Sequence, residues 1–329
     1  MGAQLSKSLY VNLKSRKQKQ TNDSNADSAV LSDSSSSRAI KLITSIDELD
    51  VTRVYHAVEE SEYFLPIDSI EQDRLELQVG EYHLVKSLLS TMPISDVICV
   101  EAQDLLKLPG TKVLDVGAAK GWWLDSLLKS YPTAKYFGTD VSPEVVLSAS
   151  KFLPTIDFST GNVADGLPYE DNTFDYVHQR FLVLGLAKDK FHLAIRELMR
   201  VAKPGGWIEL VELDIKGYRS GPMAEKIQSA LHEIMKSRNL DLFAGANLHN
   251  YLLKATHNNS IRVANARRKT VSLPINWGGP LGTMHGHDCK ELYIGLEDAL
   301  HKKLGIERAE YKEYIEQVWK EWAAYKSFG

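Results

Sequence analysis

The chain has 329 residues, 43% of them apolar and 25% charged, which is close to the average for globular proteins. A formal net charge of −4 argues against a nucleic-acid-binding surface, and no run of about 18 apolar residues is present that could span a membrane. Cys99 and Cys289 are too few for a disulfide framework, so we expect a reducing, cytoplasmic setting.

The amino terminus differs in composition from the rest of the chain. MGAQLSKS places Gly2 after the initiator Met and Ser6 where the N-myristoylation pattern requires a hydroxyl. A basic cluster follows, and an acyl chain with such a cluster makes a two-signal membrane anchor. We therefore predict a disordered tail over residues 1–38, with acylation of Gly2 and peripheral membrane contact through residues 1–19. An unmodified disordered tail is the alternative.

The next part of the chain, residues 39–110, is typical of an irregular helical segment. Leu75 and Val79 recur at helical spacing in RLELQVGEYHLVKSLL. Tyr63 and Phe64 precede this helix on a predicted loop. We expect the segment to act as a lid, with these two aromatic residues lining a substrate pocket; packing in the core is the alternative for both.

From residue 111 onward, short strands alternate with helices. Strand-like runs are KVLDV, KYFGT, IDFST, FDYVH and WIELVEL, and KFHLAIRELMRVA shows a helical period. Such alternation predicts a parallel sheet with right-handed crossovers and helices on both faces. We therefore predict the α/β class, with a Rossmann-like, doubly wound and mainly parallel sheet over residues 111–275 and helical additions at both ends.

Residues 276–329 are predicted to form a carboxyl-terminal helical segment that packs on this core. AEYKEYIEQVWKEWAAYKSF places an apolar stripe on one helix face, which is typical of packing. MHGHDC contains potential metal ligands, but no partner pair stands out elsewhere, so we predict a glycine-rich loop and no metal site. The chain after Pro274 is mostly loop and helix, which leaves open whether a seventh, antiparallel strand completes the sheet.

The stretch VLDVGAAKGWW predicts a strand, a turn and a helix that hold a cofactor. The small residues are spaced as Gly117, Ala119 and Gly121, and no third small residue stands where the dinucleotide pattern G-x-G-x-x-G requires one. The phosphate-loop pattern G-x-x-x-x-G-K-[ST] is also absent from this turn. The spacing therefore argues against an NAD-dependent oxidoreductase.

Two carboxylates favour a different cofactor. Asp115 stands just before the turn, where it would repel a pyrophosphate but attract the ammonium and sulfonium groups of S-adenosylmethionine. Asp140 ends the next strand, where it can accept hydrogen bonds from two ribose hydroxyls. The pair predicts S-adenosylmethionine as the cofactor.

These motifs, taken in order, make the chain similar to class I S-adenosylmethionine-dependent methyltransferases. VLDVGAAKG resembles their first motif and GTDVSP their second, while GNVADGLPYEDNTFDYV and RVAKPGGWIELVELD resemble the third and fourth strand regions. YFLPIDSIEQDRLELQ and LPYEDNTFDYVHQRFL resemble the fungal branch related to secondary-metabolism regulators and trans-aconitate-type methyltransferases. The resemblance covers about residues 51–325.

The resemblance implies a role for each matching residue around the cofactor. Gly117, Ala119 and Gly121 would let the backbone approach it, with Asp115 near its amino end and Asp140 at its ribose.

Further matching residues lie after the third and fourth strands. Asn162 and Val163 would edge the adenine, and Asp165 is a rival for that contact. His178 and Arg180 would face the methyl-transfer region.

Methyl transfer from a sulfonium is an in-line displacement that depends on orientation and exclusion of water. His178 is the first candidate for a base or an orienting group, because an imidazole titrates near neutral pH. A strand-end histidine satisfied by the backbone is the alternative. Glu212, nearer the carboxyl end of its strand than Glu209, is the second catalytic candidate.

The sequence thus predicts an S-adenosylmethionine-dependent methyltransferase that acts on a small molecule. The alternative is a cofactor-binding regulatory or scaffold protein that has lost catalysis and is tethered to membrane. Ala119 and Lys120 support this alternative, since one restricts the turn and the other places a positive charge near a cationic ligand.

Overall fold

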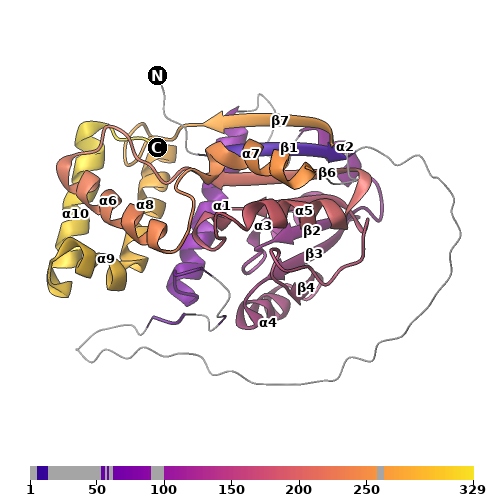
Figure 1. The fold of residues 1–329 in the computed structure, drawn as a ribbon, viewed down its shortest axis with the longest axis horizontal. Coiled ribbons are helices and arrows are strands. Elements are labelled where there is room, and N and C mark those ends of the chain that lie inside the picture. The colour runs from indigo at the N-terminus through magenta and orange to yellow at the C-terminus, as the bar shows by residue number, and fades with distance from the viewer. Residues whose placement is uncertain (1–5, 14–52, 56–57, 59–61, 90–99, 258–262) are drawn as a thin grey trace, which may run out of the picture.

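One seven-stranded sheet organises the part of the chain that the computed structural model describes, residues 6–13, 53–55, 58, 62–89, 100–257 and 263–329 (Figure 1). The strand order is β4-β3-β2-β5-β6-β1-β7, and only β1 runs antiparallel to its neighbours. The strands are β1 (Ser6–Leu13), β2 (Lys112–Val116), β3 (Lys135–Asp140), β4 (Asp157–Thr160), β5 (Phe174–Arg180), β6 (Ala202–Leu213) and β7 (Val263–Val271). The predicted Rossmann-like, mainly parallel sheet is confirmed.

Helices cover both faces of this sheet, as expected for a doubly wound fold. They are α1 (Ser69–Leu89), α2 (Val100–Leu106), α3 (Trp122–Ser130), α4 (Pro143–Phe152), α5 (Phe191–Val201), α6 (Pro222–Ser237), α7 (Ala244–Thr256), α8 (Pro280–Gly295), α9 (Glu297–Leu304) and α10 (Arg308–Tyr325), with a short 3-10 helix at Leu182–Leu184. The apolar sides of α5 and α7 pack with one face, and those of α2 and α3 with the other.

The four helices α6, α8, α9 and α10 gather beside the sheet, and α1 lies between them and the strands (Figure 1). The arrow of β7, which is parallel to β6, points towards this group (Figure 1). The helical group therefore lies beyond the carboxyl ends of the parallel strands, where ligands bind in open α/β sheets.

The predicted disordered tail over residues 1–38 is wrong for residues 6–13, which form strand β1. Leu9, Val11 and Leu13 are buried on one face of the sheet and Tyr10 on the other. β1 pairs along its length with both β6 and β7, so its backbone groups are satisfied on both sides. Alternating apolar residues let this segment form a buried strand, although the composition around it is polar. The rest of the predicted tail, including Gly2, lies outside the described residues.

β1 also answers the question of the seventh strand. Its carboxyl end is bonded to the glycine pair within β6, because Asn12 Nδ2 donates to the carbonyl oxygens of Gly205 at 2.9 Å and Gly206 at 3.0 Å. The antiparallel strand of this sheet therefore comes from the amino-terminal segment.

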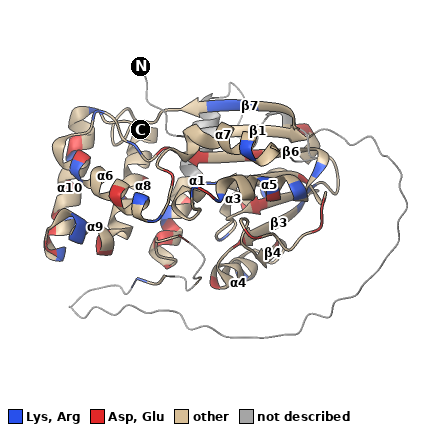
Figure 2. Ribbon diagram, viewed as in Figure 1, with Lys and Arg blue, Asp and Glu red and all other residues tan. Residues whose placement is uncertain are grey.

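Basic residues form a band on strand β7 (Figure 2). β7 carries Arg267, Arg268 and Lys269 on exposed positions. In the described part of the chain, no helix combines the length and the apolar character needed to cross a membrane.

Candidate active site

A cavity of about 450 Å³ lies at the carboxyl ends of the parallel strands. One wall consists of the ends of β2, β3 and β5 and the loops after them, which we call the strand wall. Residues of α1 and α8 line another part of the cavity, which we call the helical wall. The strand wall contains the residues that the sequence motifs identified.

The turn after β2 brings backbone to the cavity, and Gly117 and Ala119 line it. Gly117 has φ +73°, and a Cβ there would lie 2.6 Å from Leu182 Cδ2, so a side chain would adopt a strained φ and displace the end of Leu182. Ala119 adopts φ +48°, in the left-handed region that glycine favours. The turn therefore forms with alanine in place.

Asp140 lines the cavity at the end of β3. Its Oδ2 accepts from Ala119 N at 3.1 Å, and its Oδ1 accepts from Ser142 N at 3.1 Å. Burial raises the pKa of Asp140, the two backbone donors act against this, and the nearby Asp115 adds to it. The carboxylate is thus fixed between two turns and faces the ligand space.

Asp115, on β2, also lines the cavity, and its Oδ1 lies 2.8 Å from His178 Nδ1 on β5. His178 is fully buried and is not among the residues that line the cavity. Its ring stacks on Trp123, with centroids 3.9 Å apart. This position does not support the predicted role of His178 as the catalytic base, because the ring contacts Asp115 and not the ligand space.

Glu212, the second predicted catalytic residue, is fully buried and does not line the cavity. It accepts from Leu182 N at 3.0 Å and Val183 N at 3.1 Å, and so holds the 3-10 helix that forms part of the strand wall. Burial raises its pKa to about 8, although these backbone donors oppose the rise. Its contacts indicate support of the wall rather than contact with substrate.

The loop after β4 places Asn162, Val163 and Asp165 on the cavity. Asn162 Nδ2 donates to Asp165 Oδ2 at 2.6 Å, and Asn162 Oδ1 accepts from Ala164 N at 3.1 Å. The candidate residues for the adenine contact therefore lie in one hydrogen-bonded turn.

Of the other predicted residues, Tyr63 and Arg180 line the cavity, whereas Phe64 and Gly121 do not. Phe64 packs into the core, with the Arg238 guanidinium 4.9 Å from its ring. A Cβ on Gly121 would lie 2.6 Å from Phe158, so this glycine serves close packing instead of ligand approach.

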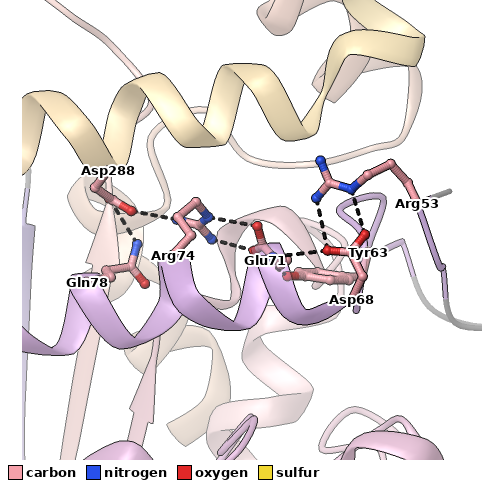
Figure 3. A network of polar contacts seen from close by, with 7 residues as sticks. All are labelled: Arg53, Tyr63, Asp68, Glu71, Arg74, Gln78 and Asp288. Atoms are coloured by element: carbon pink, nitrogen blue, oxygen red, sulfur yellow. Dashed lines mark hydrogen bonds and ion pairs between the residues drawn. The ribbon is translucent and has the colours of Figure 1, made fainter. Parts of the chain in front are cut away.

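The helical wall depends on a buried ion-pair network between α1 and α8 (Figure 3). Arg74 makes two hydrogen bonds to Glu71, at 2.6 and 2.9 Å, and one to Asp288 at 2.7 Å. Tyr63 donates to Glu71, and Gln78 donates to Asp288. These contacts join the amino-terminal and carboxyl-terminal helices at the edge of the cavity.

The stretch MHGHDC lies in helix α8, so the prediction of a glycine-rich loop is wrong. Its helical form places His285, Asp288 and Cys289 on the cavity, and Cys289 Sγ lies 3.6 Å from His285 Nε2. Among the described residues, no group of three or more His, Cys, Asp or Glu is placed to hold a metal ion.

The sequence interpretation missed this helical wall. Periodicity predicts Gln72, Arg74 and Gln78 only as part of a helical segment, and composition predicts MHGHDC as a glycine-rich loop. The available signal was the concentration of polar side chains at positions 71, 72, 74 and 78 of a helix that also carries an apolar face.

The residues around the cavity fit S-adenosylmethionine. Two carboxylates at the ends of adjacent strands match a ligand with an ammonium group at one end and vicinal hydroxyls at the other. Gln72 Oε1 and Trp122 Nε1 are buried, line the cavity and have no hydrogen-bond partner among the described residues, so both are left for a ligand.

Comparison with known proteins decides the family. Residues 113–206, which carry the strand wall, match the family described as "Methyltransferase domain". The chain is a class I methyltransferase that uses S-adenosylmethionine. This methyltransferase is similar to fungal proteins in particular.

The N-methyltransferase sirN of Leptosphaeria maculans is 26% identical over 270 residues, which cover 80% of this chain and 88% of that protein. The N-methyltransferase tcpN of Claviceps purpurea is 32% identical over 156 residues, 46% of this chain and 52% of that protein. The secondary metabolism regulator laeA of Monascus pilosus is 27% identical over 170 residues, 50% of this chain and 41% of that protein. The methyltransferase is therefore similar to fungal methyltransferases over most of its length.

Proposed function

We propose that this methyltransferase transfers the methyl group of S-adenosylmethionine to a nitrogen atom of a small molecule. The observation that carries this is the cavity itself, which the carboxylates of the strand wall and the side chains of the helical wall line together. Relatives described as N-methyltransferases support nitrogen as the acceptor atom.

In this proposal, the strand wall holds the cofactor. Asp115 binds its ammonium group, Asp140 its ribose hydroxyls, and the turn at Gly117 and Ala119 approaches it through backbone. One of Asn162, Val163 and Asp165 contacts the adenine. The bound cofactor supplies an electrophilic methyl group on a sulfonium.

The helical wall takes the acceptor. Leu75, Val79 and Leu292 line this wall, Trp322 of α10 also lines the cavity, and all four favour an apolar small molecule. His285 also lines this wall and is a candidate to accept the proton that the acceptor nitrogen loses when its bond to carbon forms. A cofactor and an acceptor bound between the two walls would displace water from around the methyl group.

Calorimetric titration with S-adenosylmethionine, followed by transfer of radiolabelled methyl from it to candidate amines, amides and organic extracts, tests this function. Micromolar cofactor binding and label in a small product would support it. Cofactor binding without turnover on any acceptor would favour a regulatory protein, a reading that the similarity to laeA supports.

Acylation of Gly2 stays a prediction, since Gly2 lies outside the described residues. Intact-mass measurement of protein made in a eukaryotic host tests it, with loss of the initiator Met and gain of one myristoyl group as the expected result.

A further inference from the structure

The carboxylate that we assign to the cofactor ammonium is held from behind by a buried histidine. Asp115 and His178 are register partners on the parallel strands β2 and β5, and Asp115 Oδ1 lies 2.8 Å from His178 Nδ1. Because a carboxylate accepts but does not donate, Nδ1 carries the proton of this hydrogen bond. His178 thus occupies Oδ1, and a ligand in the cavity would use Oδ2.

The imidazole itself is fixed in place. Trp123 of α3 stacks on it with the two ring planes 9° apart, and both side chains are almost completely buried. A ring held against an indole and inside a sheet has little freedom to rotate, so the hydrogen bond fixes the direction of the Asp115 carboxylate.

The register partners of Asp115 and His178 on the next strands are also polar, and we call this line of side chains across β2, β5, β6 and β1 the polar row. Glu209 of β6 is the register partner of His178, and Tyr10 of β1 is the register partner of Glu209. Tyr176, two residues before His178 and on the same face, donates its hydroxyl to Glu209. All four side chains are at most 5% exposed. The row therefore extends from the cavity to the amino-terminal strand.

A row of buried polar side chains is not needed for the stability of the sheet. Buried charged and polar groups carry a large desolvation cost, and apolar residues of similar volume often stabilise a core equally well. The neighbouring positions Val113 and Val211 on this face are apolar. The one member of the row that reaches the ligand space is Asp115.

We propose that His178 is a positioning residue for the amino-acid moiety of the cofactor, and that Glu209 with Tyr176 supports it from behind. His178 directs the Asp115 carboxylate towards the ammonium group, so removing its Nδ1 donor weakens ligands that carry this group and leaves others unchanged. The inference rests on the proposed binding mode and deepens it.

The test is calorimetric titration of the full-length chain with two ligands, S-adenosylmethionine and 5′-methylthioadenosine, which lacks the amino-acid moiety. His178→Phe keeps a ring to stack on Trp123 but removes the donor, and we expect it to weaken S-adenosylmethionine at least tenfold and methylthioadenosine less than twofold. His178→Asn, which presents an N–H donor near the position of Nδ1, is expected to recover most of the selectivity.

A matched pair of tyrosines controls for loss of a buried hydroxyl. Tyr176→Phe removes the hydrogen bond to Glu209 and is expected to reduce the preference for S-adenosylmethionine about threefold. Tyr136→Phe removes a buried hydroxyl in the neighbouring row that bonds to the Leu127 and Tyr131 carbonyl oxygens, and it is expected to leave the preference unchanged.

The outcomes separate the inference from the proposed function. Equal weakening of both ligands in His178→Phe, or no weakening of either, would overturn the positioning role while leaving cofactor binding intact. If His178→Phe does not fold, the His178→Asn variant and the two tyrosine variants test the inference instead. The same preference for S-adenosylmethionine over methylthioadenosine in Tyr176→Phe and Tyr136→Phe would overturn it. Wild-type protein that binds neither ligand would overturn the proposed function itself.

Discussion

The two walls of the cavity are built in different ways. The strand wall takes Asp115, Asp140 and the turns after β2 to β5 from one continuous stretch of the chain. The helical wall depends on Arg74 and Asp288, which are 214 positions apart in the sequence. A wall made of consecutive strand ends appears in the sequence as motifs, whereas a wall made of two distant helices does not.

The walls also differ in what satisfies their charges. Asp140 accepts hydrogen bonds from backbone N–H groups of adjacent turns, so its environment is local. The Glu71 and Asp288 carboxylates depend on a single guanidinium, with Tyr63 and Gln78 as neutral donors (Figure 3). Removing the Asp140 carboxylate should therefore affect cofactor binding most, and removing the Arg74 guanidinium should affect stability most.

The largest effect is expected from Arg74→Met, which keeps the length of the side chain but leaves Glu71 and Asp288 buried without a cation. Removing one partner of a buried ion pair costs about 3 to 5 kcal/mol. The free energy of unfolding in urea measures this loss.

The matched control on the helical wall is Asp288→Asn, which leaves Arg74 paired with Glu71 and can still accept its hydrogen bond. We expect it to cost less than half as much as Arg74→Met. Equal losses in the two variants would contradict the view that the unpaired carboxylates cause the instability.

The next largest effect is expected on the strand wall. Asp140→Ala removes the predicted acceptor of the ribose hydroxyls, and we expect S-adenosylmethionine to bind about a hundredfold more weakly, from the loss of charged hydrogen bonds worth about 3 kcal/mol. Asp140→Asn keeps one acceptor oxygen and should lose less. Calorimetry gives both dissociation constants, and an unchanged affinity in the Ala variant would place the ribose elsewhere.

The sequence predicted most of the strand wall, because adjacent strand ends, a tight turn and two carboxylates produce local patterns. It gave His178 and Glu212 catalytic roles that their burial does not support. A sequence pattern shows that a residue lies near the end of a strand, but it does not show whether the side chain faces the cavity or the core. Their burial and their partners, Asp115 and the 3-10 helix, are products of tertiary packing. β1 was missed because its eight residues stand in a polar terminal segment, and only β6 and β7 give it a place.

Stability should also depend on pH through Glu212, behind the strand wall. Burial raises the pKa of this carboxyl to about 8, above its ordinary value, so between these two values the folded state binds more protons than the unfolded state. The free energy of unfolding should therefore fall as pH rises, by about 2 kcal/mol between pH 6 and pH 8. Glu212→Gln should remove this slope, and denaturation of both proteins across that range measures it. An identical slope in the variant would assign the dependence to another group.

The smallest effect is expected at Ala119, where the strand wall departs from the glycine common in such turns. Its φ of +48° costs an alanine about 1 kcal/mol, so Ala119→Gly should raise the free energy of unfolding by up to that amount. Because the backbone N of residue 119 already donates to Asp140, we expect cofactor affinity to change less than twofold. Lys120→Ala, at a position that does not line the cavity, is the matched control and should alter neither quantity. A tenfold gain in affinity in the glycine variant would show instead that Ala119 weakens cofactor binding. That result would favour the alternative of a regulatory protein that has lost catalysis.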